Sequence, residues 1–258
     1  MEKTFIGLTL IEWLAVIGAF AWLPTIIQWV KDYFKKPKLT IVSGKHFDVG
    51  FTTFGPIINM SLAFLSEHKK TLIKKVEIEL VHENNDTQKF SWVWFEELLY
   101  TIDIPDGTPL DTKRNQTAIA IKIGLDDLVE KKVGFQQDSF KIEYDKQFKQ
   151  LREEERDYMQ LGKPRADLKT TQSYRALYDL FSNSFFWKIG KYHVKINTFI
   201  LENDIMVSHE FNFNLSNLDI KLLQSNIAAC HSLLEKRFID DSIVDIKLWD
   251  WVTTYKYI

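Results

Sequence analysis

Residues 72–83 read LIKKVEIELVHE and give the clearest strand pattern in the chain. Alternate positions separate an apolar face from a mostly charged one, namely Val76, Ile78, Leu80 and His82 against Lys75, Glu77, Glu79 and Val81. Because successive side chains of a strand point to opposite sides, this alternation predicts a half-buried β-strand. The turn residues 84–87 (NNDT) and the aromatic run 89–95 (KFSWVWF) extend the strand into a β-hairpin.

Further strand-like segments lie on both sides of this hairpin. They are predicted at residues 38–43, 57–66, 117–124, 139–144, 192–201 and 205–215. The run 190–194 (GKYHV) resembles the tyrosine-containing start of a late strand in immunoglobulin-like sandwiches, where the phenol bonds back to a nearby backbone group. The expected fold class is therefore mainly β, an immunoglobulin-like β-sandwich with a helical insertion and a late C-terminal helix.

The helical segments interrupt and follow these strands. Residues 145–161 (DKQFKQLREEERDYMQL) alternate in charge sign with few apolar positions, which predicts a solvent-exposed helix or a mobile insertion, within an insertion at about 145–190. Residues 173–182 (SYRALYDLFS) predict a short amphipathic helix. Ser216 followed by Asp219 forms a near capping box for a helix that reaches about Lys236. Residues 242–251 are expected to be a last strand or an extended arm.

The N-terminal residues 5–30 (FIGLTLIEWLAVIGAFAWLPTIIQWV) form the longest apolar run of the chain. As a helix its roughly 26 residues reach ~39 Å, enough to cross a hydrocarbon core of ~30 Å with some tilt. The run is too long for the apolar region of a signal peptide, and no small-residue cleavage site precedes Lys31. We therefore expect residues 1–37 to form a transmembrane helix with a basic juxtamembrane segment, and residues 38–258 to form the sandwich domain.

Charged and aromatic residues at the end of this run indicate its orientation. Lysines follow the helix densely, whereas Lys3 is the lone lysine before it, and aromatic residues mark the interface: Trp29, Lys31, Tyr33, Lys35, Lys36 and Lys38 are the expected membrane-surface residues. The positive-inside bias places the domain in the cytoplasm. The single cysteine, Cys230, fits such a reducing compartment, and we expect a single-pass protein of a bacterial inner membrane.

Glu12 is the one acidic residue inside the apolar run. On a helical wheel it shares a face with Ala15 and Ala19, and Gly18 borders that face, a small-residue surface that allows a second helix to approach closely. This pattern favours helix association into a homo-oligomer. The alternative is a glutamate that reaches the outer headgroups, with alanines that share its face by chance.

Composition limits the functional class. The net charge of −2 and the pI of about 6.3 argue against general nucleic-acid binding, which usually needs a basic face. A hydrophobic content of 45% supports a genuine core. No cofactor is expected, because glycine-rich phosphate loops are absent from the sequence.

Few residues offer catalytic chemistry. Asp241, Asp245 and Lys247 loosely resemble a nuclease metal site, but Asp241 is too close in sequence to lie on a separate strand. The pairs His82–Glu83 and His209–Glu210 place their side chains on opposite faces of a strand, which is wrong for chelation. Cys230 is interpreted as a buried, inert thiol. No catalytic or metal-binding residue is therefore predicted.

The remaining candidate is an aromatic partner surface formed by Trp92, Trp94 and Phe95, with packing between neighbouring strands as the alternative explanation. We expect a membrane-anchored, non-enzymatic protein whose β-domain binds a cytoplasmic protein or a second copy of itself. Analogy with small anchored effectors suggests a bacterial antiviral defence or stress module. The alternatives are an oligomeric pore, motivated by Glu12, and a membrane-bound hydrolase or nuclease with an unrecognised site.

Overall fold

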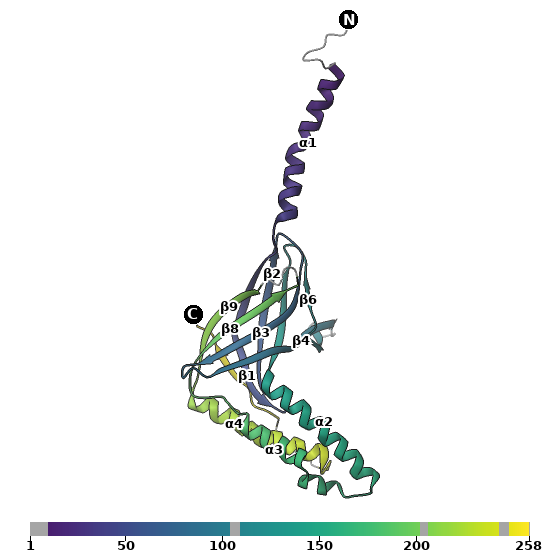
Figure 1. Cartoon of the computed structure of the whole chain (residues 1–258). Helices are drawn as coiled ribbons and strands as arrows, with labels where there is room; N and C mark the ends of the chain where they lie inside the picture. Colours follow the sequence, from purple (N-terminus) through teal and green to yellow (C-terminus); the bar gives the residue numbers. More distant parts are fainter. Residues whose placement is uncertain (1–9, 104–108, 202–205, 243–247, 258) are drawn as a thin grey trace.

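The computed structural model describes residues 10–103, 109–201, 206–242 and 248–257, without the side chains of residues 10–17, 19, 32, 98, 100, 102–103 and 109–111. A helix, α1 (Leu10–Phe34), precedes a mainly β body (Figure 1). The strands are β1 (Lys38–Thr52), β2 (Gly55–Glu67), β3 (Thr71–His82), β4 (Thr87–Asp103), β5 (Pro109–Thr117), β6 (Ile121–Ile123), β7 (Leu128–Gln137), β8 (Gly190–Ile200), β9 (Met206–Leu215) and β10 (Val252–Tyr255). The other helices are α2 (Asp138–Gln160), η1 (Arg165–Thr170), α3 (Gln172–Asn183) and α4 (Asn217–Phe238).

The described strands form one sheet that curls into a nearly closed barrel. Its order is β10-β1-β2-β7-β4-β3-β8-β9, with β5 paired to β4 and β6 paired to β3 outside this path. The two ends of the path meet where Asn212 of β9 and Tyr257 exchange backbone hydrogen bonds of 2.8 and 2.9 Å. The predicted mainly β class is confirmed.

The predicted immunoglobulin-like sandwich is wrong, because the described strands form one sheet and not two stacked sheets. Both architectures bury one face of each strand, so the apolar alternation is the same in either. The seam depends on β10, whose Val252–Tyr255 pairs with Val49–His46 of β1. A strand close to the end of the chain therefore decides closure, and local sequence patterns do not record that pairing.

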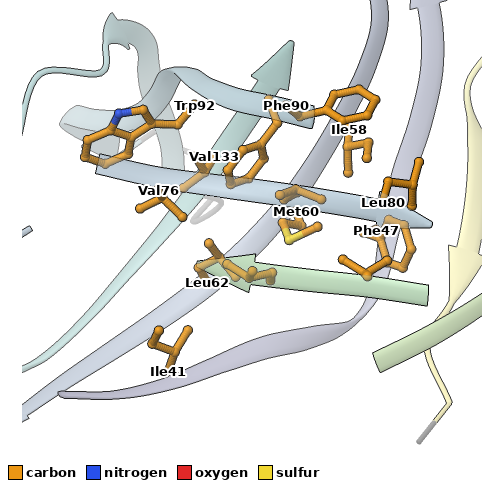
Figure 2. Packing of buried hydrophobic residues seen from close by; sticks show 14 of the residues in the cluster. Ile41, Phe47, Ile58, Met60, Leu62, Val76, Leu80, Phe90, Trp92 and Val133 are labelled. Carbon is orange, nitrogen blue, oxygen red and sulfur yellow. The ribbon is translucent and has the colours of Figure 1, made fainter. Parts of the chain in front are cut away.

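The inward faces of the strands build the main hydrophobic core. Along β3 the burial alternates as the sequence predicts, with Val76, Ile78 and Leu80 at most 1% exposed. Figure 2 shows Val76 and Leu80 in one cluster with Met60, Leu62 and Phe90 from neighbouring strands. The hairpins β3–β4 and β8–β9 are both antiparallel and adjacent, as their turn signals indicate.

The helices α2, α3 and α4 lie together at the end of the barrel opposite α1 (Figure 1). They enclose a second core, to which the barrel contributes Phe51: Phe51, Phe140, Leu151, Leu168, Tyr174, Leu177, Phe181, Cys230, Leu234 and Phe238. The amphipathic helix predicted at 173–182 is confirmed, since Leu177 and Phe181 of α3 are almost fully buried. This layer closes one end of the barrel.

The strand predicted at residues 139–144 is wrong, because these residues form the first turns of α2. Their short alternation fits a strand, but Phe140, Tyr144 and Phe148 recur every four residues and stack at centroid distances of 5.7 and 5.3 Å. That spacing is helical and becomes visible only when the window extends beyond Tyr144. The helical insertion therefore starts at Asp138, not at about 145.

Two local predictions are confirmed in detail. Ser216 and Asp219 form a complete capping box at the start of α4. The Tyr192 hydroxyl accepts from the Lys188 amide at 2.6 Å and donates to the Lys188 carbonyl at 3.0 Å, which is the expected return to a nearby backbone group. The tyrosine thus fixes the entry of β8 in a barrel as it does in a sandwich.

The last residues cross the helical end before they join the sheet. The Asn226 amide of α4 donates to the Asp250 carbonyl and accepts from the Asp250 amide, both at 2.8 Å. The last strand begins at Val252. The described residues of the segment predicted as a last strand or an extended arm, 242 and 248–251, therefore precede this strand, and residues 243–247 lie outside the described residues. None of the helices in the described part of the chain combines the length and the hydropathy that a membrane span requires.

Candidate functional site

A β-bulge in β4 determines which side chains of the aromatic run point into the barrel. This run was expected to form a partner surface. Trp92 pairs with Phe135 and Phe95 with Val133, whereas Trp94 pairs with Gly134 after a register shift. Trp92 and Phe95 therefore point into the barrel, each 8% exposed, and Trp94 points outward. Plain alternation would have put Trp92 and Trp94 on one face. The three side chains do not share one face of β4, although Trp92 and Trp94 both line the groove described below.

Gly134 makes room for the Trp94 indole. A Cβ added at Gly134 would lie 2.1 Å from the indole Cε2 atom, closer than any real contact. The ring therefore lies directly on the backbone of β7, which no larger residue at position 134 would permit without moving the ring. Sequence reasoning did not single out Gly134, although an isolated glycine inside a strand signals a close approach of this kind.

Trp94 lies in a groove between the β4–β5 hairpin and the start of α2, which we call the Trp94 groove. Its volume is about 640 Å³, and its walls combine aromatic rings with side-chain amides: Phe54, Ile57, Trp92, Val93, Trp94, Asn115, Gln116, Thr117, Ala118, Gln136, Lys141, Tyr144 and Asp145. Gln136 donates to the Phe54 carbonyl at 2.8 Å, and Lys141 pairs with Asp145 at 2.5 Å. Apolar walls with a few fixed polar groups are typical of a binding site.

A second groove of about 610 Å³ runs between α2, α4 and Trp249, which we call the α2–α4 groove. Three cations and Asp241 line it, and Arg165 already donates to the carbonyls of Arg237 and Phe238 at 2.8 and 3.2 Å. Arg165 thereby satisfies the free carbonyl groups at the end of α4. The Arg237 guanidinium stacks on Phe148 at 4.7 Å from the ring centroid. These contacts indicate that the residues of the α2–α4 groove mainly hold the helices together.

Tyr144 lines both grooves. Burial raises the pKa of its phenol above the ordinary value, so the hydroxyl stays protonated near neutral pH. The group can donate a hydrogen bond to a ligand but is not poised to act as a base.

The residues weighed for catalysis hold structural positions. His82 is buried, with Nδ1 2.8 Å from Asn84 Oδ1 and Nε2 3.1 Å from the Ile189 carbonyl. Burial raises the pKa of the Cys230 thiol to about 12, which agrees with the predicted buried thiol. The Asp241 side chain is 88% exposed, and Asp245 and Lys247 lie outside the described residues. In the described part of the chain, no three His, Cys, Asp or Glu side chains gather as metal ligands.

The expected membrane-surface residues lie at the end of α1 and the start of β1. Trp29 and Tyr33 are 72% and 74% exposed, and Lys31, Lys35 and Lys36 are exposed beside them. Lys38 forms an ion pair with Glu67 at 2.7 Å. Of the helix-association residues, Gly18 is exposed with no atom within 4 Å of an added Cβ. The side chains of Glu12, Ala15 and Ala19 lie outside the described residues.

No protein-family model matches the chain, and no curated protein matches it. Among solved structures the chain is similar to a family 123 glycoside hydrolase from Clostridium perfringens, reported in a study of glycolipid glycan hydrolysis. The TM-score is 0.35 and the identity 9%, over 71% of this chain and 28% of the hydrolase chain. A likeness this distant supports no inference about fold or activity.

Proposed function

We propose that this protein is a membrane-anchored, non-enzymatic binding protein of a bacterial inner membrane. In this proposal residues 5–30 cross the bilayer, and the barrel presents the Trp94 groove to a protein partner in the cytoplasm. The observation that carries the proposal is the surface of α1, because its large apolar side chains are exposed: Phe20, Trp22, Leu23, Ile26, Ile27, Trp29 and Val30 at 40–72%.

Such a helix is unfavourable in water. Burying one large apolar side chain is worth about 1.5–3 kcal/mol, so seven of them provide a strong drive toward an apolar environment. An isolated helix also gains too little from its own hydrogen bonds to persist without a packed face. A lipid bilayer surrounds the helix and covers its apolar side chains on all sides. The lysines from Lys31 to Lys38 favour a cytoplasmic C-terminus.

The orientation is tested by reporters fused after Ile258. We expect a fluorescent protein to be active and alkaline phosphatase to be silent, because the lysine cluster retains the domain in the cytoplasm. Phosphatase activity on the periplasmic side would overturn the orientation, together with the compartment of the partner.

The Trp94 groove fits a segment of a partner protein that carries an apolar anchor residue. Trp94 and Phe54 supply rigid apolar area, and Phe54 is 57% exposed at the rim. The exposed amide of Asn115 supplies a neutral donor and acceptor for a peptide backbone, whereas Gln116 and Gln136 already donate to Glu97 and to the Phe54 carbonyl. Aromatic anchors surrounded by polar groups are the usual pattern of a protein interface.

Photo-cross-linking from the groove tests this binding role. A benzoylphenylalanine residue at Phe54 should yield a discrete heavier adduct in cells, whereas one at Tyr255, 70% exposed on the barrel edge, should not. Trp94→Ala should reduce the adduct at least tenfold, since loss of an interface tryptophan costs about 2 kcal/mol or more.

The matched control is Trp251→Ala. Trp251 also lies on a glycine, Gly50, where an added Cβ would be 2.4 Å from its ring, but it lies outside the Trp94 groove. Equal losses for both variants would mean that the effect is structural. Adducts of equal strength from Phe54 and Tyr255 would rule out the groove as the binding site, and an adduct with a second copy of the chain would identify the partner as the protein itself.

A further inference from the structure

The end of the barrel from which α1 leaves carries its own set of exposed residues. The strand pairings Lys38 with Glu67, Thr71 with Ile123, and Phe199 with Met206 place the β2–β3 and β6–β7 connections, the end of β8 and the start of β9 at this end. The helices α2, α3 and α4 lie at the opposite end (Figure 1). Among the described residues, this end is formed by the β2–β3 and β6–β7 connections and by the adjoining ends of β8 and β9, and we call it the loop end.

A hydrogen bond, a cation–π contact and a short link hold the loop end close to α1. Lys69 of the β2–β3 connection donates from Nζ to the Tyr33 carbonyl in the last turn of α1 at 2.7 Å. The same ammonium lies 5.8 Å from the centroid of the Tyr33 ring. Only residues 35–37 separate α1 from β1, and the four steps from Phe34 to Lys38 span at most ~14 Å. If α1 crosses a bilayer, the loop end therefore lies at the surface of that bilayer.

The loop end exposes large apolar side chains. Leu125 and Leu128 are 51% and 67% exposed, and Leu201 and Met206, on either side of the β8–β9 connection, are 56% and 51% exposed. Connections between strands usually carry polar turn residues in water. Several large apolar residues gathered at one end indicate a surface that another phase or molecule covers.

Charged side chains of both signs surround these apolar residues. Lys35, Lys36, Lys70 and Lys122 are exposed at this end, together with Asp126, Asp127 and Glu130, and the sequence places Glu202 and Asp204 between Leu201 and Met206. Lysines beside inserted apolar side chains are the usual composition of surfaces that rest on anionic headgroups.

We propose that the loop end is a second membrane contact, in which Leu125, Leu201 and Met206 insert among the headgroups of the bilayer that α1 crosses. This inference rests on the proposed anchoring. The contact aligns the barrel with the membrane normal, and β1 of 15 residues then carries the Trp94 groove roughly 35–40 Å from the bilayer. The barrel thus acts as a spacer of fixed orientation and not as a freely swinging domain.

The depth of single nitroxide labels tests this contact in the full chain. Labels are placed at Leu125→Cys and Leu201→Cys, with Ile142→Cys as control, because Ile142 is 70% exposed on α2 at the far end. Cys230 stays in place, since it is buried and its thiol is hard to ionise. The protein is reconstituted in vesicles of phosphatidylcholine and phosphatidylglycerol. We expect oxygen to relax the labels at 125 and 201 more than a water-soluble nickel chelate does, and the reverse at 142.

Alkaline extraction of the same vesicles separates the two proposals. If the protein stays in the membrane but all three labels report water, the loop-end contact is wrong and the anchoring stands. If the protein is extracted, the anchoring fails and this contact with it.

Trypsin cleavage after Lys35 provides a second readout. The double variant Leu125→Asp, Leu201→Asp should expose this link and speed cleavage by roughly tenfold or more, because charged side chains no longer insert. Ile142→Asp should leave the rate unchanged. Equal rates for the wild type and the double variant would contradict the proposal.

Discussion

The two ends of the barrel use their apolar residues in opposite ways. At the helical end Phe140, Leu151 and Phe181 are at most 2% exposed inside the second core. At the loop end Leu125, Leu201 and Met206 are 51–56% exposed. The same sheet is therefore closed by protein at one end and left apolar at the other. The difference separates residues that stabilise the fold from residues available for an external surface.

The largest expected effect contrasts single truncations at the two ends. Phe140→Ala should lower the free energy of unfolding by about 3–5 kcal/mol, since it empties a site closed by the Gly55 backbone and the ring of Tyr144. Leu125→Ala should change it by less than about 0.5 kcal/mol. Urea unfolding of the full chain in detergent micelles measures both. Similar losses would show that the loop end is also part of the stabilising core.

A smaller effect tests the fit of Trp94 on Gly134. Gly134→Ala should cost about 1–3 kcal/mol by overpacking against the indole, and most of that cost should disappear in a Trp94→Ala background. Gly44→Ala is the control, because the nearest atom to its added Cβ is 3.4 Å away. Additive costs for Gly134→Ala and Trp94→Ala would mean that the two residues do not interact.

The next prediction asks whether α1 only tethers the loop end or also joins two copies. Ala19→Leu should weaken association by about tenfold, since it pushes the helix backbones apart, while Glu12→Gln should preserve association through its amide. Ala21→Leu, on another face of the helix, is the matched control. Oligomer size in mild detergent is the measurement. One common size for the wild type and all three variants would leave α1 as a passive anchor.

The smallest effect concerns the seam between the ends. Lys256 donates to the Ser43 hydroxyl at 3.0 Å, which leaves that hydroxyl to donate to an unprotonated His209 Nε2 at 3.0 Å. Burial, followed by the charge of Lys256, lowers the pKa of His209 below its ordinary value of 6.5. The unfolded chain then binds the proton more readily, so this stabilisation is complete above pH ~6.5 and is lost as the pH falls through the lower folded pKa.

The wild type should therefore lose more thermal stability between pH 7.5 and 5.5 than His209→Gln does. The melting temperatures of both proteins at both pH values measure the difference, and the other titrating groups cancel in the comparison. Identical shifts would mean that His209 ionises as readily in the fold as in the unfolded chain.

Features set by neighbouring residues were predictable from the sequence. The strand at 72–83, the hairpin to 89–95, the capping box at Ser216 and the return of Tyr192 to Lys188 each depend on contacts within a few residues or one turn. The buried Cys230 was predicted from its position in the middle of a helix, where His231 does not face it. In such cases the local backbone geometry and the residue type jointly specify the result.

The candidate site depends on information that the aromatic run does not contain. One extra residue in β4 turns Trp94 outward and leaves Trp92 and Phe95 inside, and that bulge is set by pairing with β7, about forty residues away. The α2 wall of the groove was also missed, because a strand-like hexapeptide continues into a helical spacing only after Tyr144.

The sequence by itself determined the mainly β class, the faces of the strands and the apolar N-terminal run, because alternation and run length are properties of consecutive residues. Tertiary structure alone decided that the sheet closes into a barrel, since closure requires Tyr257 to meet Asn212 and β10 to meet β1. It also decided that the exposed leucines of separate connections gather at one end. Such contacts join residues far apart in the chain, and a pattern of neighbours does not encode their partners.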